Sequence, residues 1–381
     1  MAGAHDSVDV AVVGAGVIGA TIALFLARGG MKVALIDRGL ICRQASGVNA
    51  GTLTMQMTRV ALIPFALRAH HMWATAPQWL GHEVGVVVCE GLSVAFTDGE
   101  AELLAERAAK RRTAGAPIEL VDGARAGQIE PGLSDQVKLA GHCRVDGFAN
   151  AYLTGIAYRR ALVDAGASIR ENTRIVAAEE GASGYVLRAQ GGAMIAARRV
   201  VLAGGVWLQE MAAWFGQRLP IKCLINQLAV TERLAPVMRT VLGIASGLLS
   251  LKQYPHGTVV IGGGWQGIGD PVHGPRAIVP ENFLGNVRLA SHTVPRLMSG
   301  RIVRAWLGLE AETADALPAV GALPGHPHVL VCGSVHSGYT SGPYIAKLLA
   351  EQMLGHAADL SLQPFDVARL IEGANSPTMP P

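Results

Sequence analysis

Charged side chains are scarce in this chain. Asp, Glu, Lys and Arg make up 16% of the 381 residues, whereas an average soluble protein carries about 25%. The charges nearly balance, with 32 Lys and Arg against 29 Asp and Glu, and the longest basic run is Lys110–Arg112. These values exclude a disordered, highly charged protein and make nucleic acid an unsuitable partner. Either other subunits cover part of the surface, or the chain is an Ala-rich and Gly-rich monomer.

Cysteine is scarce as well, and its spacing excludes several kinds of site. The five cysteines lie far apart, form no C-x-x-C pair and are odd in number, at Cys42, Cys89, Cys143, Cys223 and Cys332. This pattern is typical of a reducing compartment, so we expect a cytoplasmic protein. No histidine set has zinc-ligand spacing, the cysteines lack iron–sulfur spacing, and no P-loop or G-x-S-x-G motif occurs. We therefore expect no metal in this chain.

One long uncharged run needs a separate explanation. Residues 10–27 carry no charge over 18 positions, which is the length of a membrane span. β-branched residues open the run and phased glycines interrupt it, a pattern that favours a strand, a turn and a helix. The N-terminus shows no cationic region of a secretory signal. We expect no transmembrane segment and leave a peripheral association with a membrane open.

The length and the order of patterns predict two domains. A chain of 381 residues holds two or three structural units of about 100 to 200 residues each. Strand–helix patterns occur at the start, middle and end, and residues 219–264 hold short β-prone runs separated by turns. We predict an α/β fold with a discontinuous Rossmann-like nucleotide domain and an antiparallel-sheet domain for substrate or interface contacts. The boundaries are residues 1–75, 142–216 and 306–372 for the first domain, 76–141 and 217–305 for the second, and 373–381 for a frayed tail.

Individual elements follow from hydrophobic periodicity and from turn residues. Strands are expected at residues 8–13, 32–36, 168–176, 199–203, 221–231, 258–262 and 329–332. Helices are expected at 20–28, 64–76, 101–114, 151–165 and 344–354. We expect the charged helix at 101–114 to be solvated on one face. Residues 45–53 and 333–343 are expected to be loops of small residues.

A glycine fingerprint lies between the first strand and the first helix. Gly14 permits a tight turn, Gly16 lets a pyrophosphate approach the backbone, and Gly19 allows close helix packing. The positive end of the helix would bind the anion. Asp37 follows Gly19 by 18 residues, at a strand end where a carboxylate accepts from both ribose hydroxyls and repels a 2′-phosphate. The pattern predicts a dinucleotide site that disfavours NADP.

Two further segments bear on the choice between FAD and NAD. Residues 45–53 are small, so they can pass close to a flat ring and donate backbone hydrogen bonds, although an ordinary surface loop has the same composition. Residues 333–343 offer backbone donors at the start of a helix. Partial positive charge there would stabilise the anion that develops at N1 and C2=O of a reduced isoalloxazine. These segments favour FAD.

Taken in order, the motifs resemble the FAD-dependent D-amino-acid oxidase superfamily, which includes glycine oxidase and monomeric sarcosine oxidase. Within it, the chain is most similar to the flavin β subunits of D-hydroxyproline dehydrogenase and opine oxidase, and to the third subunit of hydrogen cyanide synthase. The resemblance spans residues 8–356. The matching stretches are the fingerprint, Ala45–Leu53, Val200–Gly205 with Trp207, Leu219–Gln227, Leu251–Gln253 before Gly257, Trp306 with Gly308, Asp315–Gly321 and the closing Gly-rich loop.

The resemblance implies non-covalent FAD in a Rossmann-like domain. Arg144–Asp146 aligns near the segment where a related subunit carries a histidine bonded to FMN, and Val145 cannot form that bond. A covalent FMN is therefore not expected, and a non-covalent FMN at a subunit interface stays an alternative. The implied cofactor-binding residues are Gly14, Gly16, Val17, Ile18, Gly19, Asp37, Arg38, Ala45, Ser46, Asn49, Ala50, Gly51, Thr52, Leu53, Ile175, Val176, Gly204, Gly205, Trp207, Gly333, Ser334, His336, Ser337, Gly338, Tyr339 and Thr340.

The substrate pocket departs from the family pattern. Oxidases of the family often hold the substrate carboxylate with an Arg in a W-x-G-x-R-P context, but this chain has Glu310 there and His336 where a second Arg is common. A cationic group on the substrate, or a carboxylate held by His336 and Lys252, is therefore expected. The candidate catalytic residues are His336, Tyr339, Glu310, Lys252 and Gln253, with a structural role as the alternative for each.

The resemblance implies an FAD-dependent dehydrogenase that acts on CH–NH or CH–NH₂ donors. Hydride passes from the α-carbon of the substrate to flavin N5 and leaves an imine. The expected substrate is D-hydroxyproline, an opine or a related amino or imino acid. The expected partners are other subunits of a hetero-oligomer that carry the electron relay. A stand-alone oxidase that uses oxygen and a non-catalytic, FAD-binding scaffold subunit are the alternatives.

Overall fold

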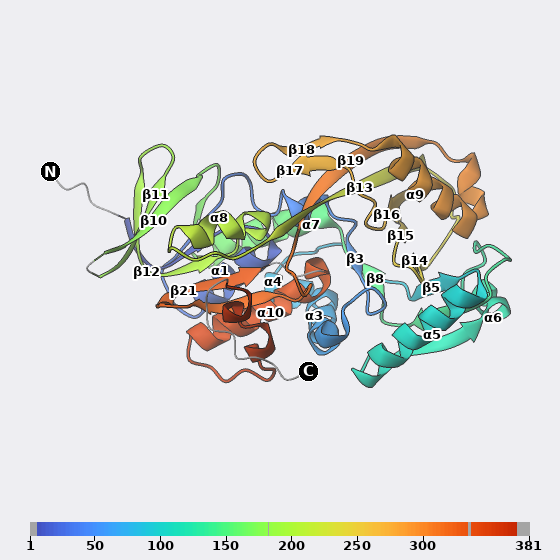
Figure 1. Cartoon of the computed structure of the whole chain (residues 1–381), viewed down its shortest axis with the longest axis horizontal. Coiled ribbons are helices and arrows are strands. Elements are labelled where there is room, and N and C mark those ends of the chain that lie inside the picture. Colours follow the sequence, from blue (N-terminus) through green and yellow to red (C-terminus); the bar gives the residue numbers. More distant parts are fainter. Residues whose placement is uncertain (1–5, 182, 334–336, 372–381) are drawn as a thin grey trace.

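The central strands of the first β-sheet are parallel, and they include β1, the first strand of the structure (Figure 1). The computed structural model describes residues 6–181, 183–333 and 337–371. Strand β1 lies between β2 and β12, parallel to both; β9 extends the sheet beyond β2, and β21 runs parallel to β12. Antiparallel β10, β11 and β20 complete it. The strands are β1 Asp6–Val13, β2 Val33–Ile36, β9 Ser168–Arg170, β10 Ile175–Gly181, β11 Gly184–Ala189, β12 Met194–Leu202, β20 Ala319–Leu323 and β21 His326–Gly333.

Both faces of this sheet are covered, which explains why β1 is apolar on both sides. Val10 and Val12 pack into a core with α1, α3, α7 and α10, whereas Ala11 and Val13 pack into a second core with α8. A continuous apolar run is typical of a strand that is buried on both faces. The helices are α1 Val17–Arg28, α3 Ile63–Ala74, α7 Ala151–Asp164, α8 Leu208–Ala213 and α10 Gly338–Met353.

The second sheet lies at the other end of the elongated molecule and is mainly antiparallel (Figure 1). Its strand order is β19-β13-β16-β15-β14-β5-β7-β6, and only β14 and β5 pair in parallel. Helix α9 covers its core, and α5 packs against β5, β6 and β7. The bounds are β5 Gly91–Ala95, α5 Asp98–Thr113, β6 Ile118–Asp122, β7 Leu139–Cys143, β13 Lys222–Arg233, β14 Val241–Ile244, β15 Ser250–Gln253, β16 Thr258–Gly262, α9 Pro280–Thr293 and β19 Ile302–Glu312.

The remaining elements are short. Strands β3, β4 and β8 form a small three-stranded sheet, and β17 pairs with β18. The bounds are α2 Ala45–Val48, β3 Thr52–Leu53, α4 Ala76–Leu80, β4 Val87–Val88, α6 Gly123–Ile129, β8 Gly147–Phe148, β17 Ile268–Asp270 and β18 Gly274–Ala277, with 3₁₀ helices η1 Val60–Leu62, η2 Gly205–Trp207, η3 Pro295–Ser299, η4 Gln363–Phe365 and η5 Val367–Leu370.

The predicted α/β fold, with a Rossmann-like sheet and an antiparallel second sheet, is confirmed, but some boundaries differ. The domain boundary expected at residue 142 falls inside β7, and the one expected at 306 falls inside β19. Both strands belong to the second sheet. The predicted strand at 168–176 is two strands: β9 ends at Arg170, β10 begins at Ile175, and Asn172 between them adopts a left-handed conformation (φ 54°) that interrupts the extended chain. The amide of Thr173 then donates to Asp37 O (2.7 Å), which turns the chain toward β10.

Helix α10 begins at Gly338, earlier than the expected 344, and it contains Pro343. A proline inside a helix removes the hydrogen bond to the carbonyl four residues before it, which here belongs to Tyr339. The indole Nε1 of Trp73 donates to this carbonyl instead (3.0 Å), and the rings of Trp73 and Tyr339 stack with centroids 4.8 Å apart. A donor from α3 therefore satisfies the acceptor that Pro343 leaves open.

Trp73→Phe should destabilise the protein by about 1–3 kcal/mol, because it leaves the Tyr339 carbonyl without its donor while it keeps an aromatic ring. Adding Pro343→Ala should restore part of the lost stability, since an alanine at this position provides the missing helical N–H. Urea unfolding of the single and double variants, followed by circular dichroism, measures this coupling.

Trp79→Phe is the matched control, because the Trp79 indole also donates to a helix carbonyl, that of Met72 (2.6 Å), but not one that a proline exposes. The change in unfolding free energy caused by Trp79→Phe should simply add to the change caused by Pro343→Ala, with no coupling between the two substitutions. Equal coupling in both pairs would contradict the explanation.

Candidate functional site

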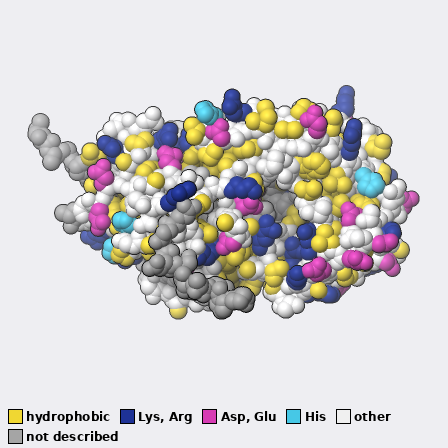
Figure 2. Space-filling view, viewed as in Figure 1, with side chains coloured by type: hydrophobic (Ala, Val, Ile, Leu, Met, Phe, Trp, Pro, Cys, Tyr) yellow, Lys and Arg dark blue, Asp and Glu magenta, His cyan; other side chains and the backbone are white. Residues whose placement is uncertain are grey.

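A cavity of about 720 Å³ runs between the two sheets. Its lining begins at the ends of β1 and β2 and the start of α1, and it continues along α2 and the first turn of α10. It then follows β19, β13, β16, β15, β14 and β5 across the second sheet and reaches α5. Figure 2 shows a hollow in the middle of this face, with Lys and Arg side chains beside it.

The glycine fingerprint forms one end of the cavity. A Cβ on Gly14 (φ +108°) would lie 2.4 Å from the carbonyl oxygen of Ala203, and one on Gly19 would lie 1.9 Å from that of Gly14. Gly16 caps α1, and the first-turn amides of Ile18 and Gly19 lie where no helix carbonyl can reach them. The turn therefore presents backbone donors and a positive helix end, a combination that fits a pyrophosphate.

Asp37 lies beside this turn at the end of β2. Its carboxylate accepts hydrogen bonds from the amides of Ala15 (2.6 Å) and Gly39 (2.7 Å). Burial raises the pKa of Asp37, and these two amides oppose that rise. The guanidinium of Arg38 lies 4.6 Å from the ring centroid of Trp207. The fingerprint, the acid and this stacked pair form one continuous wall, as a dinucleotide requires.

The expected loop at 45–53 begins with one helical turn, α2. The Ser46 hydroxyl accepts from the amide of Val17 (2.9 Å), so it joins α2 to the start of α1. The Asn49 side chain donates to the carbonyls of Ala45 and Ser46 and accepts from the amide of Gly51 (2.6 Å), which ends the helix. This segment is held by its own polar side chains and presents its backbone to the cavity.

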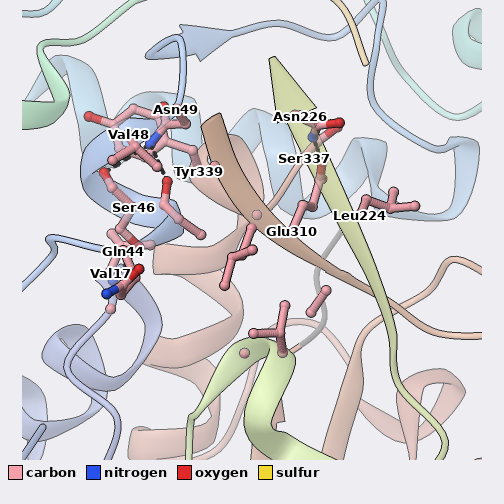
Figure 3. Close-up of a pocket in the computed structure, with 18 of the residues that line it drawn as sticks. Val17, Gln44, Ser46, Val48, Asn49, Leu224, Asn226, Glu310, Ser337 and Tyr339 are labelled. Atoms are coloured by element: carbon pink, nitrogen blue, oxygen red, sulfur yellow. Dashed lines mark hydrogen bonds between the residues drawn. The ribbon is translucent and has the colours of Figure 1, made fainter. Parts of the chain in front are cut away.

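The first turn of α10 forms the wall beside this segment. Ser337 lies at the N-cap (φ 59°), and the Thr340 hydroxyl donates to Thr52 O (3.1 Å). The hydroxyl groups of Tyr339 and Thr154 are hydrogen-bonded to each other (2.7 Å). Figure 3 shows Tyr339 near the α2 residues, and the Ser337 hydroxyl donates to Met57 O (3.4 Å). Ser334 and His336 lie outside the described residues.

Glu310 lies on β19 in the part of the cavity under the second sheet. Its carboxylate accepts from the Asn226 side chain on β13 (2.5 Å), and the Asn226 carbonyl accepts from Gln266 (2.5 Å). Figure 3 shows Asn226 and Leu224 across the pocket from Ser46 and Val48. The acid is therefore oriented by a chain of amides and faces the same space as α2 and α10.

Lys252 and Gln253 lie behind the cavity wall, among the described residues that do not line it. The side-chain nitrogen of Lys252 donates hydrogen bonds to Ala50 O (2.9 Å), Ser250 Oγ (3.1 Å) and the Thr52 hydroxyl. Burial lowers the pKa of Lys252 to about 7. The Gln253 side chain accepts from the amide of Val237 (2.9 Å) and donates to Gly257 O (2.9 Å). Lys252 thus supports the segment that lines the cavity, whereas Gln253 joins two loops.

Most of the predicted cofactor-binding residues do line the cavity. They are Gly14, Gly16, Val17, Ile18, Asp37, Arg38, Ala45, Ser46, Asn49, Ala50, Thr52, Ile175, Gly204, Gly205, Trp207, Gly333, Ser337, Gly338, Tyr339 and Thr340. The exceptions have packing roles or face outward: Gly19 packs on the Gly14 backbone, Gly51 approaches Ala149, Leu53 is fully buried in the core, and Val176 is 37% exposed.

Other lining residues were not expected from the sequence and come from the segment after β3, from α5, and from strands and loops of the second sheet. The polar ones include Gln56, Arg59, Ser93, Arg107, Arg111, Asn226, Gln227, Ser246 and Gln266. A signal existed for two of them, because Arg107 and Arg111 are one helical turn apart and share a face with the buried Leu104 and Ala108. Asn226 and Gln227 lie in the matching stretch Leu219–Gln227, but no local pattern marks them or the others as lining residues, since only the folded chain brings these segments together.

Neither a metal site nor a membrane-spanning helix occurs in the described part of the chain. Within residues 6–181, 183–333 and 337–371, no group of His, Cys, Asp and Glu could hold a metal ion. No helix of these ranges is long and apolar enough to cross a membrane. All five cysteines are free thiols.

Comparison with known proteins agrees with the geometry. A family model described as FAD dependent oxidoreductase matches residues 9–352. The chain is 27% identical to glycine oxidase of Geobacillus kaustophilus, covering 95% of this chain and 97% of that protein. It is 28% identical to a subunit of opine oxidase from Rhizobium meliloti, with 95% and 97% covered. The crystal structure of the Geobacillus kaustophilus glycine oxidase superimposes with a TM-score of 0.86 at 26% identity, covering 95% of this chain and 98% of that one.

The resemblance inferred from the motifs is thereby confirmed, and so is FAD as the cofactor. The fingerprint turn, which has no room for a Cβ at Gly14 or Gly19, suits the close approach of that cofactor to the backbone. The chain belongs to the DAO family and is an FAD-dependent oxidoreductase.

Proposed function

We propose that this chain oxidises the C–N bond of an amino or imino acid to an imine, as the catalytic subunit of a larger dehydrogenase. The observation that carries the proposal is one continuous cavity that joins the dinucleotide cradle to an oriented carboxylate, Glu310. An acid at this place suits a substrate that is a cation, as amines are at neutral pH. The similarity to glycine oxidase and to the opine oxidase subunit supports the same class of reaction.

The residues along the first sheet would hold FAD. The amides of the first turn of α1 would bind the pyrophosphate, and Asp37 would accept from the ribose hydroxyls. The backbone of α2 and the segment up to Thr52 would lie beside the flavin ring. The N-terminus of α10 would place its positive end near the part of the ring that becomes negative. When bound, FAD would accept a hydride, that is, two electrons and a proton, from the carbon next to the substrate nitrogen.

Glu310 would position the amine of the substrate. The Asn226 amide occupies one side of its carboxylate and holds it in place, so the acid needs no reorientation when the amine arrives. A carboxylate at that position would also accept the proton that a substrate ammonium loses before its C–H bond is oxidised. Lys252 would act through the backbone, since it holds Ala50 and Thr52.

Two observations support a hetero-oligomer. The first is that one relative, from opine oxidase, is by name a subunit. The second is that large apolar side chains are exposed on elements of the second-sheet region, with Val272 at 80%, Met298 at 79% and Val303 at 63%. A partner that covers these side chains would remove apolar surface from water. A relay in another subunit would then take the electrons from FAD.

Asp37→Ala should weaken FAD binding by about one to two orders of magnitude, because a hydrogen bond to a charged group contributes about 1.5–3 kcal/mol. Quenching of flavin fluorescence on titration with apoprotein measures the dissociation constant. Asp9→Ala is the control, since Asp9 also accepts a backbone amide beside β2, that of Lys32 (2.9 Å), but lies outside the cavity lining. If the two variants lose FAD equally, the assigned role of Asp37 is wrong.

Glu310→Gln should lower kcat/KM for secondary-amine substrates about ten- to hundredfold, because it removes one charged contact and keeps an acceptor for Asn226. The dissociation constant of FAD should stay unchanged. Glu312→Gln provides the control on the same strand, where Glu312 pairs with Lys222 (3.2 Å) and does not line the cavity. Steady-state kinetics in which both variants match the parent would place the amine elsewhere.

The FAD-loaded chain alone should reduce an artificial dye with an amino acid and form little hydrogen peroxide, because its natural acceptor is another subunit. Native mass spectrometry of the protein purified from its own host should show the chain bound to partners. Full turnover with oxygen by the isolated chain, at the rate seen with the dye, would instead identify a stand-alone oxidase.

A further inference from the structure

A second pocket, of about 490 Å³, lies in the second sheet. It opens where the parallel strands β5 and β14 begin, and α6 forms its other side. Figure 1 shows β5, β14 and α6 together at the end of the molecule that is remote from the first sheet. None of the residues that line this pocket lines the large cavity. We call it the β5–β14 pocket, and its volume is within the range of about 300–1,000 Å³ that small-molecule sites have.

Glu90 supplies a carboxylate to the β5–β14 pocket from a strained position. Its backbone adopts a left-handed conformation (φ 64°), which is uncommon for a residue other than glycine and is found most often at functional positions. Its Oε2 is hydrogen-bonded to Nε2 of His142 (2.7 Å), a buried side chain. The other carboxylate oxygen has no hydrogen-bond partner among residues 6–181, 183–333 and 337–371. A ligand can therefore bind to it.

Arg125 and Arg239 supply two guanidinium groups to the same pocket. Arg239 Nε donates to Ile129 O (2.7 Å), and its Nη2 donates to Gln128 O (2.9 Å). These two carbonyls fix the guanidinium and leave the N–H groups of its other edge for a ligand. Arg125 Nη1 donates to the Gln128 side chain (2.9 Å). In the part of the chain that the structure describes, neither arginine has an ion-pair partner.

The other polar groups beside the pocket are neutral or already compensated. The buried carboxylate of Glu130 accepts from the amides of Gly132 (3.1 Å), Arg239 (2.7 Å) and Thr240 (2.8 Å), and from the Thr240 hydroxyl (2.9 Å). Burial raises the pKa of the Cys89 thiol to about 12, so this thiol is neutral at pH 7. The β5–β14 pocket therefore offers a ligand two positive groups and one negative group.

This charge pattern is complementary to a zwitterion. A simple anion would be attracted by the two guanidinium groups and repelled by Glu90, and a simple cation would experience the reverse. Within the described residues, Glu90 forms no ion pair with Arg125 or Arg239. The pocket thus keeps its opposite charges apart, and a ligand can lie between them. A small molecule that carries a carboxylate and an ammonium group close together satisfies all three side chains.

We propose that the β5–β14 pocket is a second binding site, for a free α-amino acid, in which Arg125 and Arg239 hold the carboxylate and Glu90 holds the ammonium group. Arginine suits the carboxylate because its planar fork donates two parallel hydrogen bonds. The inference does not depend on the proposed oxidation, since the ligand binds outside the cavity that holds the dinucleotide cradle.

The probe is α-aminoisobutyrate, an α-amino acid whose α-carbon has no hydrogen, so that a flavin cannot oxidise it. Isobutyrate and isopropylamine are its matched halves, because each lacks one of the two charged groups. Ligand-observed NMR titration of the FAD-loaded chain measures the dissociation constants, and flavin absorbance reports ligand in the large cavity. The parent should bind α-aminoisobutyrate about ten- to hundredfold more tightly than either half, without a change in the flavin spectrum.

Arg125→Gln and Glu90→Gln should each weaken this binding about tenfold or more. Arg125→Gln decides the case if Glu90→Gln fails to fold, because Arg125 is exposed and its side chain bonds only to Gln128 among the described residues. Arg144→Gln and Glu119→Gln are the matched controls. These two exposed residues pair with each other (3.7 Å) near the same end of the sheet and line neither pocket. Both control variants should bind the probe as the parent does.

Several outcomes would overturn the inference. One is that α-aminoisobutyrate binds nowhere outside the large cavity, and another is that both pocket variants retain the binding. Isobutyrate that binds as tightly as the probe would identify an anion site, and isopropylamine that does so would identify a cation site; either result contradicts a zwitterion site. The proposed oxidation is judged separately, because its substrate must reduce the flavin and α-aminoisobutyrate cannot.

Discussion

The close approach of the Gly14 turn to the end of β12 is the constraint on which the rest of the site depends. A Cβ on Gly14 would collide with the carbonyl of Ala203, and one on Gly19 would collide with Gly14 itself. The absence of both side chains lets β1, β12 and α1 meet at one point. The helix then starts at the wall of the cavity with its amides exposed to it, and Asp37 at the end of the neighbouring strand joins the same wall.

The cavity changes chemical character along its length because different elements supply its walls. Backbone amides and helix ends line the part on the first sheet, where a large, flat and anionic cofactor would bind. Under the second sheet, the lining becomes a row of strand side chains, with Glu310 oriented by Asn226 at one edge and arginines near the other.

The sequence predicted best those elements whose formation depends on residues close together in the chain. The β1–α1 unit, α7, β13 and β21 follow from apolar periodicity and from glycine turns within a few residues. The start of α10 was misplaced because Pro343 normally ends a helix, and only the indole of Trp73, far away in sequence, supplies the missing donor. The short strands β5, β7, β14 and β15 gave little periodicity, since pairing with distant strands stabilises them.

The sequence by itself determined the dinucleotide fingerprint, the acid that follows it, the α/β class and the family, because each depends on residue types at short, fixed spacings. It also identified Glu310 as a departure from the family pattern. Only the tertiary structure decided which side chains share the cavity. It placed Lys252 and Gln253 behind the wall and brought Arg59 to the arginines of α5. Such neighbours are set by the order of strands in a sheet, and strand order depends on contacts that no local spacing encodes.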